Sequence, residues 1–166
     1  MALSQREFNR WVDEHAPALF RLAFRLVGDR HEAEDVVQDT FRSAWKSRES
    51  YTPTAGERAW LAAILRRRVV DRWRKHPQPA PTSDESSLEI GVPGIDPTAN
   101  EYSDEMQYAL NQIVPELRET LLLVVVGELT HQEAADLLKI PLGTILSRVS
   151  RARAKLRELL LARASR

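Results

Sequence analysis

The sequence contains no cysteine, so disulfide bonds, thiolate metal sites and thiol redox sensing are excluded within this chain. It also lacks the stretch of about 18 consecutive apolar residues that a membrane span requires, since its longest apolar run covers only residues 121–126. The N-terminal segment holds no basic stretch followed by an apolar core, which is the pattern of a secretory signal. These absences predict a cytoplasmic protein without a membrane span.

Catalytic motifs are missing as well. The six glycines are isolated from one another, so no glycine-rich phosphate loop can form. The histidines are scattered, without the His-Glu-x-x-His spacing of zinc enzymes, at positions His15, His31, His76 and His131. We therefore expect no enzymatic activity, no metal, no cofactor and no small-molecule substrate.

The charges are balanced in total but sorted along the chain. Residues 58–75 contain seven basic residues and one acid, and residues 142–166 repeat that ratio. Between them, residues 84–105 contain seven acids and no base. Local basic patches matter more than net charge for binding a polyanion. The two basic segments are therefore candidate nucleic-acid surfaces, with solvated helix faces as the alternative.

Apolar residues recur at helical spacing along most of the chain, and no segment shows the period-two alternation of a strand. Residues 76–103 differ, because they hold five of the nine prolines among serine, glycine and acidic residues. Such a composition cannot bury enough apolar surface to offset its chain entropy. The prediction is an all-α protein with two small helical domains, residues 1–75 and 104–166, joined by a flexible, proline-rich, acidic linker.

Four helix starts are indicated by a capping residue followed three positions later by glutamate, a pair that can satisfy free backbone N–H groups reciprocally. These pairs are Ser4 and Glu7, Asp29 and Glu32, Thr54 and Glu57, and Thr130 and Glu133.

The C-terminal domain is expected to contain a helix-turn-helix. A short helix capped by Thr130 ends at residues 139–141, and a second helix begins near Leu142 or Gly143. One face of the second helix is apolar, and the opposite face is polar and basic, which is typical of a recognition helix in the major groove. An ordinary helical hairpin with a charged surface is the alternative. The residues on the polar face are Thr144, Ser147, Arg148, Arg151 and Lys155.

The segment AEDVVQDTFRSAW, residues 33–45, resembles the region with which sigma factors of the extracytoplasmic-function (ECF) group, in the sigma-70 family, bind RNA polymerase. The resemblance implies core RNA polymerase as a partner. Without it, the same acidic face would be interpreted as merely solvated. The implied polymerase contacts are Glu34, Asp35, Gln38 and Asp39.

The segment AWLAAILRRRVVDRWRK, residues 59–75, is similar to the helix of that family which melts promoter DNA and reads the minus-10 element. Arg67 stands where the family usually has asparagine, a change that could turn a base contact into a phosphate contact. The resemblance implies minus-10 contacts at Tyr51, Arg66, Arg67, Arg68, Asp71, Arg72, Arg74 and Lys75.

Tyr51 has two interpretations. It lies in residues 48–56, which correspond to the segment that captures a flipped promoter base in the family. Stacking on a base is worth about 1–3 kcal/mol, comparable with the few kcal/mol that base extrusion costs. The alternative for Tyr51 is packing in the core, which is also the preferred interpretation of Trp60.

Residues 106–156 resemble the family's minus-35-reading domain, so the recognition helix is expected to read that element of promoter DNA. Two DNA-binding domains joined by one linker gain avidity once the polymerase fixes the distance between them, which is otherwise undefined. The resemblance also implies a separate anti-sigma factor, and an acidic linker that follows a positive channel of the polymerase unless it is a plain tether. The function implied is promoter recognition in transcription initiation.

Two other functions stay open from the sequence. A stand-alone helix-turn-helix transcriptional regulator would use only the C-terminal domain on DNA, and a helical adaptor would bind only proteins. The basic run in residues 66–75 favours the sigma factor over the regulator, because a sensor or dimerisation domain needs no second nucleic-acid surface.

Overall fold

The computed structural model describes residues 3–75 and 97–165, and in these two ranges the chain forms helices and turns without any strand. The expected all-α fold is confirmed. No helix in this part of the chain is both long enough and apolar enough to cross a membrane. The elements are α1 (Gln5–Val27), α2 (Arg30–Lys46), the 3-10 turns η1 (Arg48–Ser50) and η2 (Pro53–Ala55), α3 (Glu57–Lys75), α4 (Pro97–Asn111), α5 (Pro115–Val125), α6 (His131–Leu138) and α7 (Leu142–Ala164).

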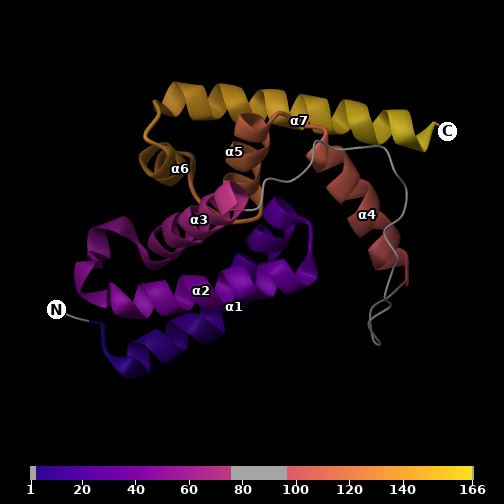
Figure 1. Ribbon diagram of the computed structural model, residues 1–166. Coiled ribbons are helices and arrows are strands. Elements are labelled where there is room, and N and C mark those ends of the chain that lie inside the picture. Colours follow the sequence, from indigo (N-terminus) through magenta and orange to yellow (C-terminus); the bar gives the residue numbers. More distant parts are fainter. Residues whose placement is uncertain (1–2, 76–96, 166) are drawn as a thin grey trace.

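Helices α1 to α3 pack together as a first lobe, residues 3–75 (Figure 1). Leu22 and Ala23 of α1, Val36 of α2 and Leu61 and Leu65 of α3 are almost fully removed from solvent. Burial of one such leucine or valine side chain stabilises the fold by about 1.5–3 kcal/mol. The helical spacing of these residues therefore supplies the contacts that hold the three helices together.

Helices α4 to α7 form a second lobe, residues 97–165, in which α7 lies across the other three (Figure 1). Ile113, Leu123 and Ile145 are fully buried between these helices. Pro115 stands at the start of α5, where its missing N–H is not needed by the helix. The apolar stripe expected along the recognition helix is confirmed, because its first members face this core.

Three of the four predicted helix caps are present. Ser4 with Glu7 and Thr130 with Glu133 form complete capping boxes, with hydrogen bonds in both directions. The side chain of Asp29 accepts a hydrogen bond of 2.9 Å from the backbone N–H of Glu32.

The predicted cap at Thr54 is wrong. Thr54 lies in the turn η2, and α3 begins only at Glu57. Pro53 opens the turn, and Gly56, with a positive φ of 75°, redirects the chain before the helix starts. Glu57 is therefore free to contact α1 and does not fold back onto a cap.

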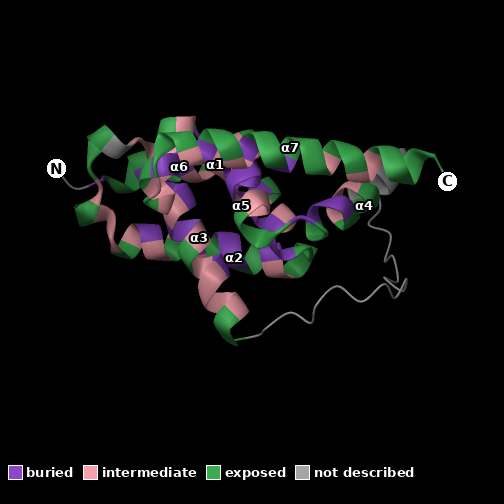
Figure 2. Ribbon diagram, turned by 90° about the horizontal axis from the view of Figure 1, so that it is seen from above, coloured by how far each residue is buried: buried purple, intermediate pink, exposed green. Residues whose placement is uncertain are grey.

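The two lobes pack against each other, whereas the sequence analysis expected their separation to be undefined. Helix α1 contacts α5, and α3 contacts α6. One continuous group of buried side chains includes Leu22 and Leu26 of α1 together with Leu122 and Leu123 of α5. Figure 2 shows buried residues on the inner faces of the helices and exposed residues along the outer side of α7. Apolar surface on both lobes explains the contact.

The predicted linker, residues 76–103, is only partly covered by the structure. Residues 76–96 lie outside the described ranges. Residues 97–103 form the first turns of α4, so the linker prediction is wrong for this part. Proline is tolerated at the first position of a helix, and Pro97 occupies that position. The prolines throughout the segment predict a linker, and this signal hides the helix start at Pro97.

Candidate nucleic-acid and polymerase interfaces

The outer face of α7 carries the side chains predicted for the recognition helix. Ile145, Val149 and Ala152 are buried and fix the rotation of the helix about its axis. As a result, Ser147, Arg151 and Lys155 are exposed, and Thr144 and Arg148 are half-buried. All five predicted residues thus lie outside the buried stripe, two of them at its edge.

Two of these cations are available to a ligand. Among the described residues, Arg148 and Arg151 have no hydrogen-bond or ion-pair partner. Lys155 lies 3.6 Å from Glu158, three residues further along the same helix. An exposed pair of this kind contributes little to stability and exchanges readily for another anion.

The turn between α6 and α7 has a defined geometry. Lys139 ends α6 in the left-handed conformation, with φ at 57°, and the next backbone N–H, of Ile140, donates to the carbonyl of Ala135 at 3.2 Å. The carbonyl of Pro141 then accepts from Thr144 and Ile145 at the start of α7. Backbone hydrogen bonds therefore hold the first turn of α7 in one orientation, as a helix-turn-helix requires.

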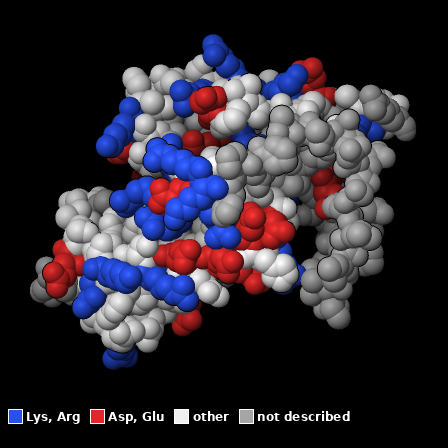
Figure 3. Space-filling model, in the orientation of Figure 1, with Lys and Arg blue, Asp and Glu red and all other residues white. Residues whose placement is uncertain are grey.

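Apart from Tyr51, which lies between η1 and η2, the residues predicted for the minus-10 element fall on α3. Figure 3 shows lysine and arginine side chains gathered over this helix, with acidic side chains among them. Arg67, Arg74 and Lys75 are exposed, whereas Arg66, Arg68 and Arg72 are half-buried. The sequence did not anticipate this division into two groups.

The half-buried arginines of α3 are each paired with an acid. Arg68 lies 3.5 Å from Asp71 on the same helix, and Arg72 lies 3.7 Å from Asp35 of α2. Arg66 is hydrogen-bonded to Glu119 of the second lobe. These pairs neutralise part of the positive charge of α3, so its exposed cations dominate the surface that faces solvent.

Tyr51 belongs to an aromatic group. Its ring meets the ring of Trp11 edge to face, with 4.8 Å between centroids, and that of Trp60 with 5.3 Å. Burial, with a smaller contribution from the charge of Glu57, raises the pKa of the Tyr51 hydroxyl. Trp11 is buried, and Tyr51 and Trp60 are half-buried. The aromatic group thus holds the segment from η1 to η2 against α1 and α3.

The acidic face of α2 is on the surface. Glu34, Asp35 and Gln38 are exposed and Asp39 is half-buried. Glu34 and Asp39 pair with arginines of the same helix, at 3.6 Å from Arg30 and 3.3 Å from Arg42. The predicted polymerase contacts thus form one polar strip, with Asp35 at the edge nearest to α3.

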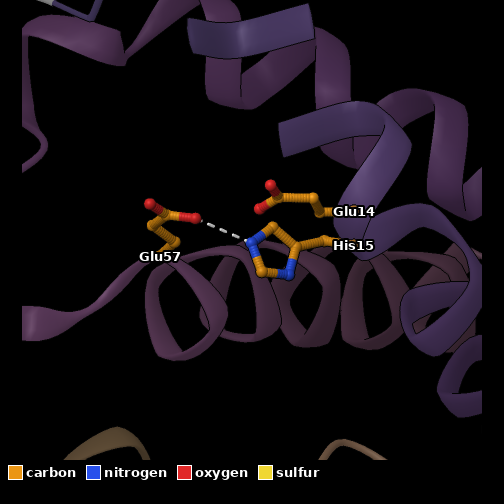
Figure 4. A group of neighbouring side chains, drawn as sticks. All are labelled: Glu14, His15 and Glu57. Carbon is orange, nitrogen blue, oxygen red and sulfur yellow. Dashed lines mark hydrogen bonds and ion pairs between the residues drawn. The ribbon is translucent and has the colours of Figure 1, made fainter. Parts of the chain in front are cut away.

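The fold also gathers a polar group that the sequence analysis did not anticipate. Figure 4 shows Glu14 and His15 of α1 facing Glu57 at the start of α3. His15 Nε2 lies 2.8 Å from a Glu57 carboxylate oxygen. Arg10 lies 3.7 Å from Glu14 and 3.4 Å from Glu57. The two carboxylates therefore already face a cation of the chain, and the group fastens α1 to α3.

Comparison with known protein families gives two matches along the chain. Residues 11–77 match the family model described as Sigma-70 region 2, and residues 103–156 match the model described as Sigma-70, region 4. The matched segments contain α3 and the helix-turn-helix, and they follow one another in the order that the sequence predicts.

Several ECF RNA polymerase sigma factors are similar over most of the chain. SigE of Mycolicibacterium smegmatis is 33% identical, covering 90% of this chain and 60% of its own length. The chain therefore spans less than two thirds of SigE. EcfG of Rhodopseudomonas palustris is also 33% identical, covering 87% of this chain and 80% of its own. SigW of Bacillus subtilis is 28% identical, covering 93% and 89%.

Two solved structures have a similar fold. CnrH, in complex with the cytosolic domain of CnrY, superimposes with a TM-score of 0.74 and 28% identity, covering 96% of this chain and 90% of that one. The sigma factor RpoE from Bartonella quintana, in complex with the anti-sigma factor NepR, gives a TM-score of 0.75 and 29% identity, covering 93% and 97%.

Proposed function

Because this chain belongs to the ECF group of RNA polymerase sigma factors, within the sigma-70 family, we propose that it recruits core RNA polymerase to promoters through two DNA-reading surfaces. Residues 1–75 would form the polymerase-binding and minus-10-reading domain, and residues 104–166 the minus-35-reading domain. Residues 76–96 would connect the first domain to the first turns of α4, residues 97–103, which lead into the second domain. The family matches at residues 11–77 and 103–156 support this division.

The observation that carries the proposal is the outer face of α7. Arg148 is half-buried beside the apolar stripe, Arg151 is exposed, and both lack partners among the described residues. An arginine in the major groove can donate two hydrogen bonds to guanine, while Ser147 and Thr144 can bond to base edges or phosphates. Lys155, further along the helix, suits a phosphate contact that fixes the register.

The exposed cations of α3 suit a second DNA contact. Arg67, Arg74 and Lys75 can bind backbone phosphates and release counterions, whatever the base sequence. Arg66, Arg68, Asp71 and Arg72 lie on the same helix and complete the proposed minus-10 surface. Tyr51, held by its aromatic neighbours, would act as a wall beside an extruded base, since its ring already makes T-shaped contacts with Trp11 and Trp60.

The polar strip of α2 is proposed to bind the polymerase. Glu34, Asp35, Gln38 and Asp39 offer hydrogen-bond acceptors on one helix face. Glu34 and Asp39 pair with exposed arginines, which an incoming basic surface can replace at little cost, and Asp35 pairs with the half-buried Arg72. Charge complementarity of this type mainly sets the rate and specificity of association.

Other partners follow from the same assignment. The similar protein RpoE is bound by an anti-sigma factor, and we expect a separate protein of that class to control this chain. The chemistry of RNA synthesis would belong to the polymerase, with no catalytic group, metal or cofactor supplied by the chain. Its place of action would be the cytoplasm, where promoter DNA and polymerase meet.

In vitro transcription tests the proposal. Purified core polymerase is mixed with a genomic promoter library, with and without the chain, and the 5′ ends of the RNA are sequenced. We expect new start sites that appear only with the chain and share two upstream motifs. A footprint on the recovered promoters, with the chain alone, is the control. Protection without polymerase, and no promoter-dependent RNA with it, would instead identify a stand-alone regulator.

A further inference from the structure

The contact between the lobes pairs bases of the first lobe with acids of the second. Arg66 of α3 donates a hydrogen bond to Glu119 of α5, and Arg58 of α3 lies 3.4 Å from Glu128. The Glu119 side chain is 17% exposed and the Arg66 side chain 34% exposed, so water screens this pair only partly. The pair involving Arg58 is more exposed and contributes less.

On the side of the interface formed by α1, the fit is closer. The Gln107 side chain of α4 donates to the carbonyl of Arg25 at 3.1 Å. Gly127 packs against Leu22, and a methyl group at Gly127 would come within 3.3 Å of that leucine. It would also come within 2.7 Å of the Leu123 carbonyl, so only glycine is accommodated. The lobes thus meet through a shaped surface as well as through ion pairs.

Arg66 occupies two roles that exclude each other. It lies on the face of α3 assigned above to minus-10 DNA, yet Glu119 takes its Nε donor. A phosphate or base that binds this guanidinium must first displace the carboxylate, because both seek the same N–H groups. In the closed molecule, the Glu119 carboxylate therefore occupies the position that an anionic ligand of α3 would take.

We propose that Glu119 is an autoinhibitory residue: it holds Arg66 and keeps the lobes closed, so that the free protein engages DNA through α3 only after the lobes separate. This inference rests on the proposed function, because it takes α3 to be a DNA surface. Only the fraction of open molecules can bind, and the apparent affinity falls by that fraction. A variant that weakens the contact should therefore bind DNA more tightly without any new contact to DNA.

Fluorescence energy transfer reports closure directly. The chain has no cysteine, so labels attach only at introduced ones. Asn9 on α1 and Ala162 on α7 are exposed and lie in different lobes. In this labelled background, Glu119→Gln should lower the transfer efficiency. The matched control is Glu116→Gln, an exposed position on the same helix with the same change of charge, and it should leave the transfer unchanged.

DNA binding completes the test. We use a labelled single-stranded oligonucleotide of mixed sequence at low salt, without polymerase. Glu119→Gln should tighten binding by about two- to fivefold, the size expected for loss of an ion pair that water partly screens. The gain should disappear in an Arg66→Gln background, where no guanidinium remains to be released. Equal gains in both backgrounds would show a general charge effect and overturn the proposal, as would unchanged energy transfer.

A second variant avoids any change of charge. Glu119 also stabilises the half-buried guanidinium of Arg118, whose pKa is lowered by burial, so Glu119→Gln can disturb folding. Gln107→Ala removes hydrogen bonds on the opposite side of the interface, at 3.1 Å and 3.4 Å from Arg25. It should open the lobes and tighten DNA binding in the same Arg66-dependent way. Opening without tighter binding would overturn the autoinhibitory role.

The outcome is separable from that of the proposed function. Energy transfer and oligonucleotide binding are measured on the full chain without polymerase, whereas the proposed function is tested by polymerase-dependent transcription. If the wild-type chain supports transcription but Glu119→Gln leaves energy transfer and oligonucleotide binding unchanged, only the autoinhibitory role of Glu119 is refuted. If Glu119→Gln changes energy transfer and oligonucleotide binding but the chain supports no transcription, only the assignment of the chain to promoter recognition is refuted.

Discussion

Single residues of α7 divide between packing and ligand binding according to helical periodicity. Ile145, Val149 and Ala152 are buried at spacings of four and three, and this fixes which residues can face a partner. That arrangement leaves the side chain of Arg148 half-buried and that of Arg151 exposed. The apolar stripe is thus what positions the cations, and changes to the cations alone leave the fold intact.

Arg148→Ala and Arg151→Ala should each weaken use of the upstream promoter element. A bidentate contact with guanine is worth about 1–3 kcal/mol, which is roughly five- to 150-fold in binding. Transcription from a cognate promoter with core polymerase measures the loss. Arg157→Ala is the matched control, since this exposed arginine of the same helix lies outside the predicted recognition residues. Full activity of both variants would contradict the assigned recognition face.

At the scale of elements, helix starts decide how the domains are assembled. The capping box of Thr130 and Glu133 fixes the start of α6, so the turn that leads into α7 begins from a defined position. Thr54, which the sequence suggested as an equivalent cap, makes only a hydroxyl contact of 3.5 Å with Thr52. The two threonines therefore offer a comparison of a true cap with an apparent one.

Thr130→Ala should lower the free energy of unfolding by about 1 kcal/mol, because the N–H of Glu133 loses its acceptor. Thr54→Ala should change it by less than about 0.5 kcal/mol, as expected for a surface substitution. Urea denaturation followed by circular dichroism measures both. A larger loss for Thr54→Ala than for Thr130→Ala would contradict the helix boundaries described here.

Helix α2 is predicted to supply the polymerase contact. Asp35→Arg should reduce co-purification with core polymerase, because it reverses a charge on the exposed polar strip. The lost contact with the half-buried Arg72 is 3.7 Å long and Asp35 itself is exposed, so the fold should tolerate the change. Asp13→Arg, an exposed acid of α1 outside the strip, is the control. Unchanged recovery of polymerase with Asp35→Arg, at equal helix content, would refute the assignment.

At the scale of the whole molecule, local patterns predicted the elements but not their arrangement. Apolar spacing and caps identified α2, α6 and α7, because these signals lie within a few residues of each other. The contact of His15 with Glu57, separated by 42 positions, has no such signal. Nor does the pairing of Arg66 with Glu119, which depends on how two lobes meet. Long-range contacts depend on the fold. Sequence patterns therefore located both arginine-rich helices but did not show which of their cations are already paired.

The last prediction concerns the distance between the two DNA surfaces. Inserting about five base pairs between the promoter elements turns them to opposite sides of the duplex, since one helical turn takes about 10–10.5 base pairs. One chain held on polymerase cannot then contact both elements, and the gain from binding them together is lost. Transcription from the altered promoter should fall to the level seen with the upstream element deleted. The matched control replaces the spacer with another sequence of equal length, which should keep full activity. Unreduced transcription after the insertion would mean that the two surfaces do not read one promoter together.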